Sequence, residues 1–168
     1  FMYTLPTVMD GLSLSASYSP QGSNDESSTA FAGTYTGVEG LDVGFAYGDN
    51  ESAAATVENT VMYAKYAIDA FTIGVQDNTT DSETASADSD FRAYGISYAV
   101  NDDMSISYNI ASVEYENSNL EDQDATGMSF SYTNGSMTFS GSMNEVDNIQ
   151  GASATDNSGY ELNISFAF

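Results

Sequence analysis

The chain has 168 residues, enough for one domain, with 2 Lys and Arg residues in total against 25 Asp and Glu. This balance argues against nucleic acid as a partner, because phosphates would be repelled and almost no cations could neutralise them. Without Cys or His, the chain has no disulfides, no thiol chemistry and no His-based catalytic triad. No segment approaches the roughly 18 consecutive apolar residues of a transmembrane helix.

Segments that alternate apolar and polar residues recur along the whole chain. This alternation predicts β-strands with one apolar and one wet face, since successive side chains leave a strand on opposite sides. Phe1–Leu5 is predicted to be the end of one further strand. The ten full strands are predicted at Leu12–Tyr18, Thr29–Thr36, Leu41–Tyr47, Thr60–Ile68, Phe71–Gln76, Phe91–Val100, Met104–Ser112, Thr126–Tyr132, Met137–Met143 and Gly159–Phe168.

The connections between these strands alternate between short and long. Short turns are predicted at Pro6–Gly11, Gly37–Gly40, Asp69-Ala70, Asn101–Asp103 and Thr133–Ser136, where Asn134-Gly135 suits a tight hairpin. Longer polar loops are predicted at Ser19–Ser28, Gly48–Asn59, Asp77–Asp90, Val113–Ala125 and Asn144–Ser158. The long segments hold 18 of the 25 carboxylates. This asymmetry is typical of an up-and-down antiparallel transmembrane β-barrel with short periplasmic turns and long external loops.

Two architectures fit the alternation. In a barrel the apolar face meets lipid, and the tyrosines near strand ends form an aromatic girdle. In an acidic secreted β-sandwich or surface-layer module, which could bind calcium, the apolar face would pack on a second sheet. The barrel is favoured because the sandwich does not explain the short–long rhythm of the connections or the final Phe168.

Two stretches resemble a known family. The segment from Met2 to Tyr18 is similar to a stretch of general porins of Gram-negative bacteria, especially the alphaproteobacterial kind, in which a strand ends in a Pro-containing turn followed by Gly-Leu and a second strand ending in Tyr. The end of the chain resembles the signal that the barrel-assembly machinery reads, carried here by Tyr160, Phe166 and Phe168. The chain is therefore expected to be the C-terminal part of a general diffusion porin.

The resemblance implies a 16-stranded barrel, a homotrimer and a third loop folded inward as a constriction. Counted back from Phe168, the chain would supply about 10–11 strands as a single domain over residues 1–168, with the N-terminal strands and the constriction loop missing. Such porins often carry an arginine cluster on the pore wall, whereas the only basic residues here are Lys65 and Arg92.

Alternation also divides candidate pore-lining residues from outward ones. Lys65 shares a face with Tyr63 and Ala67 and is predicted to look into the lumen, whereas Arg92 alternates with Tyr94 and Ile96 and is predicted at the outer rim. The predicted pore-lining set is Asp42, Tyr63, Lys65, Thr72, Asn109 and Glu161.

No cofactor is expected, although Ca²⁺ or Mg²⁺ could bind weakly to the spaced carboxylates Glu121, Asp122 and Asp124, which lack the EF-hand spacing. No catalytic residues are predicted, since no set of nucleophile, base and orienting group can be assembled without His or Cys. A Ser–Lys pair would need Lys65 beside a serine, and serines are too common on the predicted strands for this to indicate a site. The sequence thus predicts an outer-membrane porin that lets small hydrophilic solutes and ions diffuse, with a preference for cations. Its expected partners are outer-membrane lipid and lipopolysaccharide, two further copies in a trimer and the barrel-assembly machinery.

Overall fold

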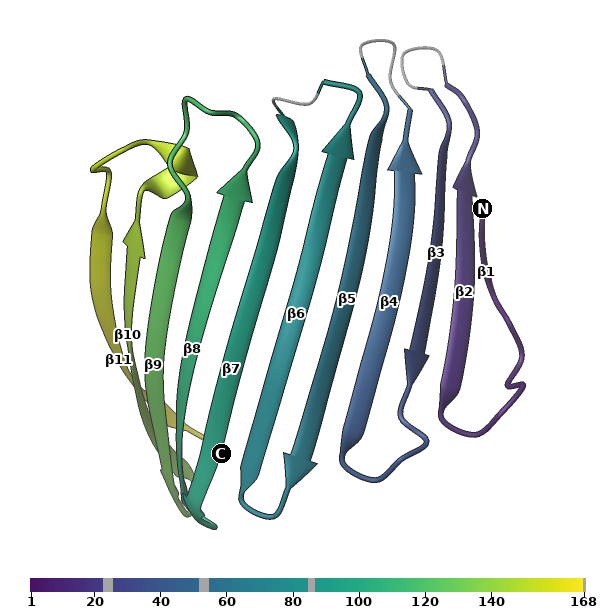
Figure 1. Ribbon diagram of the computed structural model, residues 1–168. Coiled ribbons are helices and arrows are strands. Elements are labelled where there is room, and N and C mark those ends of the chain that lie inside the picture. The colour runs from purple at the N-terminus through teal and green to yellow at the C-terminus, as the bar shows by residue number, and fades with distance from the viewer. Residues whose placement is uncertain (23–25, 52–54, 85–86, 168) are drawn as a thin grey trace.

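The computed structural model describes residues 1–22, 26–51, 55–84 and 87–167. Within these ranges eleven strands form one antiparallel sheet, and each strand pairs with its neighbours in sequence (Figure 1). This order confirms the predicted all-β, up-and-down architecture. The strands are β1 (Met2–Thr4), β2 (Leu12–Ser19), β3 (Ser28–Tyr35), β4 (Leu41–Asn50), β5 (Val57–Ile68), β6 (Phe71–Ser82), β7 (Ser89–Asn101), β8 (Met104–Tyr115), β9 (Gln123–Asn134), β10 (Met137–Asp147) and β11 (Asn157–Phe166).

The strands extend further towards the long connections than the sequence predicts. β6 continues from the predicted end at Gln76 to Ser82, and β10 continues from Met143 to Asp147. Both faces are polar in the β6 extension, and Val146 is the one apolar residue of the β10 extension, so the apolar–polar alternation that marks a strand is lost there although the backbone ladder persists. The predicted loops over 77–90 and 144–158 were accordingly too long. The loops predicted over 48–59 and 113–125 were too long for the same reason, since the strands on either side extend into them.

Short and long connections lie at opposite ends of the sheet, as predicted (Figure 1). The Asn134-Gly135 hairpin is at its predicted place, but the two residues between the strands are Gly135 and Ser136. Gly135 has φ +60°, which suits the first central position of a tight hairpin turn. Gly40, in the turn before β4, has φ +77°, and Ala67 N–H of β5 donates to its carbonyl at 2.8 Å.

Two loops at the long-connection end are tied together. A short 3-10 helix, Ile149–Gly151, follows β10, and the Gly151 carbonyl accepts a hydrogen bond from Glu121 N–H at 3.0 Å. Gln150 N–H donates to the side-chain oxygen of Gln123 at 2.8 Å, and the Asn148 amide donates to the Asp122 carbonyl at 3.0 Å. These bonds hold the β8–β9 connection against the β10–β11 connection.

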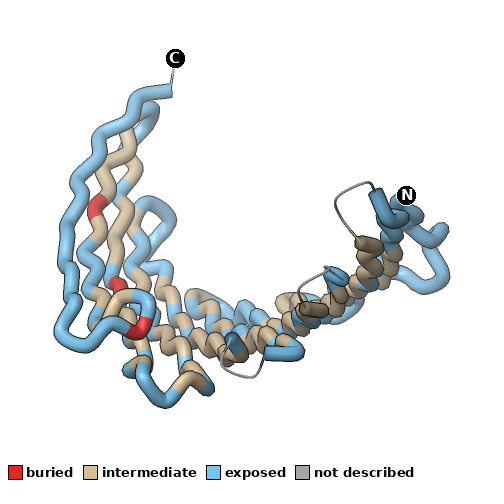
Figure 2. The backbone as a smooth tube through the Cα atoms, turned by 90° about the horizontal axis from the view of Figure 1, so that it is seen from above, coloured by how far each residue is buried: buried red, intermediate tan, exposed pale blue. Residues whose placement is uncertain are grey.

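The sheet has a single layer and curves into an open arc, with the N- and C-terminal strands at its two ends (Figure 2). No hydrophobic side chain in the described residues is buried. Large apolar side chains stand exposed along the strands, including Ile73, Ile96 and Leu162, which are 51%, 45% and 62% exposed. No helix among the described residues is long and apolar enough to cross a membrane. The apolar face therefore needs a covering that the described part of the chain does not supply.

Candidate functional site

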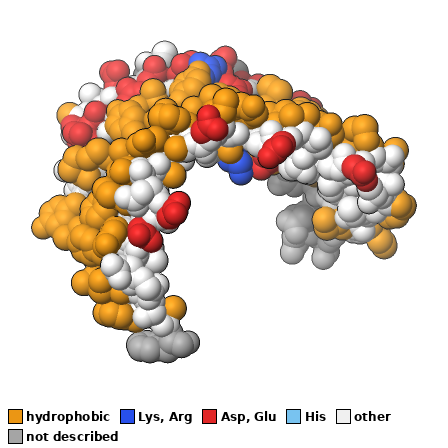
Figure 3. Space-filling view, turned by 90° about the horizontal axis from the view of Figure 1, so that it is seen from below, with side chains coloured by type: hydrophobic (Ala, Val, Ile, Leu, Met, Phe, Trp, Pro, Cys, Tyr) orange, Lys and Arg blue, Asp and Glu red, His pale blue; other side chains and the backbone are white. Residues whose placement is uncertain are grey.

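The two faces of the sheet have opposite chemistry. Hydrophobic side chains cover the convex side of the arc, and the concave side shows mainly small and polar groups (Figure 3). The ladder explains this separation, because paired residues on neighbouring strands point to the same face. Outward positions carry apolar residues through the middle of each strand, for example Ile73 opposite Ile96 and Phe71 stacked on Tyr98 with ring centroids 4.6 Å apart.

All six predicted pore-lining residues lie on the concave face. Asp42 is on β4, Tyr63 and Lys65 on β5, Thr72 on β6, Asn109 on β8 and Glu161 on β11, each at a polar position of the ladder. Three of them are brought together and the other three are spread along the wall. Their role in a pore remains a proposal.

Asp42, Tyr63 and Lys65 form one cluster, because register pairs Asp42 with Lys65 and Gly44 with Tyr63. Lys65 Nζ lies 3.1 Å from Asp42 Oδ2, and the Tyr63 hydroxyl donates to Asp42 Oδ1 at 3.0 Å. Both carboxylate oxygens of Asp42 are thereby engaged. The Lys65 side chain remains 55% exposed and the Asp42 side chain 29% exposed.

Gly44 makes room for this cluster. A Cβ at Gly44 would lie 2.2 Å from Cε1 of Tyr63, so the phenol ring occupies the space above the glycine. With the ring flat on the wall, its hydroxyl reaches diagonally to Asp42. The absence of a side chain at Gly44 thus lets Tyr63 place its hydroxyl against Asp42. The role of Gly44 could not be predicted from the sequence, because its pairing with Tyr63 depends on the register between β4 and β5.

A continuous row of hydroxyl groups crosses the concave face. The ladder places Thr72, Ser97, Ser107, Ser129 and Ser142 side by side on β6 to β10 and ends at Glu161 on β11. Ser107 and Ser129 are joined by a hydrogen bond between their hydroxyl oxygens at 2.7 Å. Such a surface can exchange hydrogen bonds with water along its whole length.

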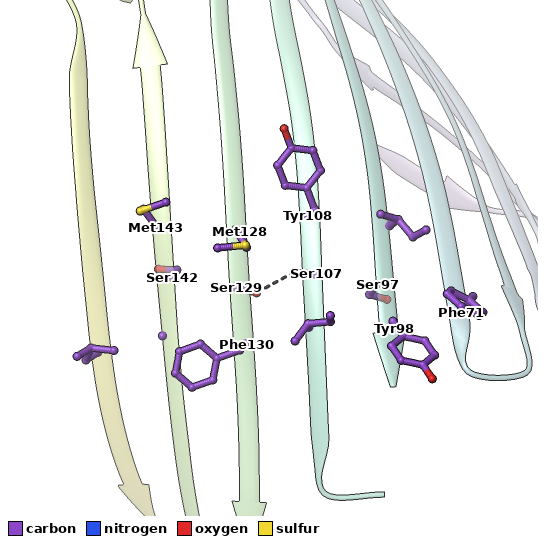
Figure 4. A pocket seen from close by; sticks show the side chains of 14 residues that line it. Phe71, Ser97, Tyr98, Ser107, Tyr108, Met128, Ser129, Phe130, Ser142 and Met143 are labelled. Atoms are coloured by element: carbon purple, nitrogen blue, oxygen red, sulfur yellow. Dashed lines mark hydrogen bonds between the residues drawn. The ribbon is translucent and has the colours of Figure 1, made fainter. Parts of the chain in front are cut away.

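The convex face carries a shallow apolar groove of about 590 Å³ over β6 to β11. Tyr108, Met128, Phe130 and Met143 line it, as Figure 4 shows together with the Ser107–Ser129 hydrogen bond. Beneath it lies buried Gly141, where a Cβ would come within 2.6 Å of Phe130 Cε1 and 2.8 Å of Leu162 Cδ2. This lining suits hydrocarbon chains, and it lies on the face opposite the predicted pore-lining residues.

Arg92 lies on the outward face at the long-connection end. Its Nε is 3.0 Å from Asp77 Oδ2, and its Nη1 is 3.8 Å from Glu114 Oε1, so one cation bridges three neighbouring strands. The prediction of an outward position is consistent with this register, in which Tyr94 and Ile96 continue the same face.

Half of the carboxylates assigned to loops stand instead on strands. Nine of the 18 occupy outward positions above the apolar residues, so the expectation that the loops carry this acid was wrong for them. They form an acidic belt, which we define as Asp49, Glu58, Asp77, Asp81, Asp90, Glu114, Asp124, Glu145 and Asp147. On the described strands of the sheet β2 to β11, the inward carboxylates are Asp42 and Glu161 and the inward cation is Lys65.

The candidate metal ligands do not converge. Glu121 and Asp122 lie in the loop that is tied to the 3-10 helix, whereas Asp124 is on β9 opposite Asp147. In the part of the chain that the structure describes, no three acidic side chains are grouped closely enough to hold a metal ion. Weak divalent binding therefore remains a prediction without a formed site.

The predicted assembly signal lies on the outward face of the last strand. Tyr160 pairs with Met143 and Phe166 with Met137, so both aromatic residues continue the apolar side of β11. Phe168 lies outside the described residues.

A model of the Gram-negative porin family matches residues 1–119. The chain belongs to the Gram-negative porin family. This confirms the family resemblance and the predicted location in the bacterial outer membrane. A search of curated proteins found no match.

Solved porin structures share the fold of the chain. It is similar to an anion-selective porin from Comamonas acidovorans, with 12% identity, a TM-score of 0.78, and coverage of 99% of this chain and 58% of that one. A substituted form of the Rh. blastica porin gives 15% identity and a TM-score of 0.72, covering 99% of this chain and 66% of that one. A further porin structure gives 18% identity and a TM-score of 0.73, covering 99% and 60%. The chain thus spans about three fifths of these porins, and the likeness shows the fold.

Proposed function

We propose that the chain forms part of the wall of an outer-membrane porin through which small hydrophilic solutes and ions diffuse passively. The observation that carries this proposal is the single curved sheet with an apolar convex face and a hydroxyl-lined concave face. Closing the arc into a barrel places lipid outside and water inside, which satisfies both faces at once. In this proposal further strands close the barrel, because the chain covers only 58–66% of these solved porins.

The proposed mechanism needs no conformational step. The row from Thr72 to Glu161 and the residues beside it keep the lumen wet, so a hydrated solute loses few of its hydrogen bonds while it crosses. Porin-family membership implies a channel, and the proposal assigns the chain no catalytic role. The alternative fold, a β-sandwich, is wrong, because the described strands form one sheet whose structural relatives are porin barrels.

We further propose a modest preference for cations, which rests on the net charge of −23. The concave strands contribute little to it, since Asp42 is paired with Lys65. The source in this proposal is the negative potential of the acidic belt and the loops at one end of the barrel, which raises the local cation concentration. The Comamonas porin of similar fold is described as anion-selective, but at 12% identity its selectivity does not carry over.

The proposed partners follow from the chemistry of the convex, outward face of the sheet. The apolar convex face suits outer-membrane lipid, with lipopolysaccharide beside the acidic belt, and two further copies would complete a homotrimer. Recognition by the barrel-assembly machinery would use the outward aromatic residues of β11.

The test is single-channel recording of the full-length porin in a planar bilayer under a KCl gradient. We expect stable ohmic steps, grouped in threes for a trimer, and a reversal potential of cation-selective sign. Folded protein that gives no steps would contradict the pore, and an anion-selective sign would contradict only the proposed source of selectivity.

A further inference from the structure

A hollow of about 310 Å³ lies on the concave face between β5 and β8, directly beside the Asp42–Tyr63–Lys65 cluster. Its floor is formed by Gly74 and Gly95, which are paired across β6 and β7. A Cβ at either glycine would meet no atom closer than 3.8 Å, so a side chain would fit there sterically but none is present. The wall is therefore bare backbone at this point, and the space above it is open to a solute.

The lining of this hollow is mostly apolar, with Ala93 opposite Gln76, and a few polar groups and one cation stand at its rim. Lys65 stands on one side, with Tyr63 and Gln76 at the next level of the ladder, and Asn109 closes the opposite side. Lys65 and Asn109 are three strand spacings apart, roughly 14 Å. That distance accommodates a solute of the size of a single sugar ring between them.

The charges of the cluster decide which solute fits. Asp42 uses one oxygen for the Tyr63 hydroxyl and the other for Lys65, so it offers little to an incoming cation. Lys65 is 55% exposed and has three ammonium donors, of which one is directed at Asp42. The group available to a passing solute is thus a donor with positive charge, flanked by carboxamides.

We propose that this hollow is a weak binding site on the pore wall for small hydroxylated carboxylates such as sugar acids. The carboxylate would accept a charge-assisted hydrogen bond from Lys65. The Gln76 amide already donates to Asn78 Oδ1 at 3.1 Å, so the hydroxyl groups would donate to the Gln76 carbonyl oxygen and exchange hydrogen bonds with the Asn109 carboxamide. Asp42 offsets part of the attraction, which keeps the site weak enough to release the solute, as conduction requires. The site would favour passage of anionic solutes, although the negative potential of the acidic belt and the loops favours cations. This inference rests on the proposed pore.

The experiment measures block of the current through the full-length porin by glucuronate in planar bilayers, with uncharged glucose as the size-matched probe. We expect glucuronate to reduce the current at lower concentrations than glucose. K65Q should raise the glucuronate concentration for half-block by about tenfold or more, as expected for loss of a hydrogen bond to a charged group. R92Q removes the same charge from the outward face and should leave the block unchanged.

A second variant tests the hollow without changing charge. G74V fills the floor with a residue that strands favour, and it should abolish the difference between glucuronate and glucose while Lys65 remains in place. Equal block by the two solutes in the wild type, or block that neither K65Q nor G74V weakens, would overturn the site while the pore stands. Absence of conductance steps before any solute is added would overturn the pore, and the site with it.

Discussion

At the scale of single residues, the side on which a residue leaves its strand decides its environment. Ile96 and Ser97 are neighbours on β7, yet Ile96 faces Ile73 and Tyr108 on the apolar side, and Ser97 faces Thr72 and Ser107 in the hydroxyl row. The same rule separates the two cations, since Lys65 lies on the concave wall and Arg92 on the outward face. Adjacent residues of a strand thus face opposite environments, lipid on the convex side and water on the concave side.

Substitution of these neighbours by lysine tests the assignment of faces. Ile96→Lys places a charge in the middle of the apolar band and should lower the free energy of unfolding by about 2–4 kcal/mol, because lipid cannot solvate the ammonium. Ser97→Lys should cost less than about 1 kcal/mol, because the lumen is wet. Urea unfolding of the full-length porin in lipid vesicles gives both values, and equal losses would refute the assignment.

At the scale of elements, the hairpins depend on glycines for two different reasons. Gly135 has φ +60° and open space where a Cβ would stand, so only its backbone conformation favours glycine. Gly40 has φ +77°, and its Cβ would lie 2.3 Å from the Ala67 carbonyl oxygen, which is backbone and cannot move aside. The turn before β4 is therefore also a packing contact with β5.

Alanine substitution separates the two reasons. Gly135→Ala should lower the free energy of unfolding by about 1–2 kcal/mol, the cost of a left-handed conformation with a Cβ. Gly40→Ala should cost about 2–4 kcal/mol, because the clash adds to that conformational cost. Gly74→Ala is the control and should be close to neutral, since its Cβ would meet only the Ala64 oxygen at 3.8 Å. Unfolding in vesicles measures all three, and a Gly40 variant as stable as the Gly135 variant would contradict the packing contact.

At the scale of the whole molecule, charge and hydrophobicity are layered along the outer surface. The outward face is apolar through the middle of the strands and becomes acidic towards the long connections, where the acidic belt runs from Asp49 to Asp147. The concave strands stay nearly neutral by comparison. Any selectivity from this charge must therefore act through space and not by contact within the lumen.

This layering predicts a strong dependence of selectivity on salt. Between 0.1 M and 1 M KCl the screening length falls from about 10 Å to about 3 Å, so the field of the acidic belt should no longer reach the pore axis. The permeability ratio of K⁺ to Cl⁻ in the full-length porin should fall towards that of free solution. A ratio that stays constant across this range would place the selectivity on residues in direct contact with the ions.

The strand pattern and the two faces were predictable from the sequence because alternation is a local property. Lys65 and Asp42 could each be placed on the polar face in this way. Their pairing could not, because it requires the register of β4 against β5, which the alternation within each strand does not specify. The strand extensions were missed for a related reason: above the apolar band both faces are polar, so Asp77 and Asp81 were read as loop although they continue the ladder of β6.

The sequence by itself determined the all-β class, the order of short and long connections and the chemistry of each face, because these follow from a two-residue period and from turn composition. Only the tertiary structure decided which inward residues meet. The stacking of Tyr63 over Gly44, the hydroxyl row and the bare floor at Gly74 and Gly95 all arise from register between strands. Register depends on the whole ladder of hydrogen bonds and on the curvature of the sheet, and no single strand contains that information.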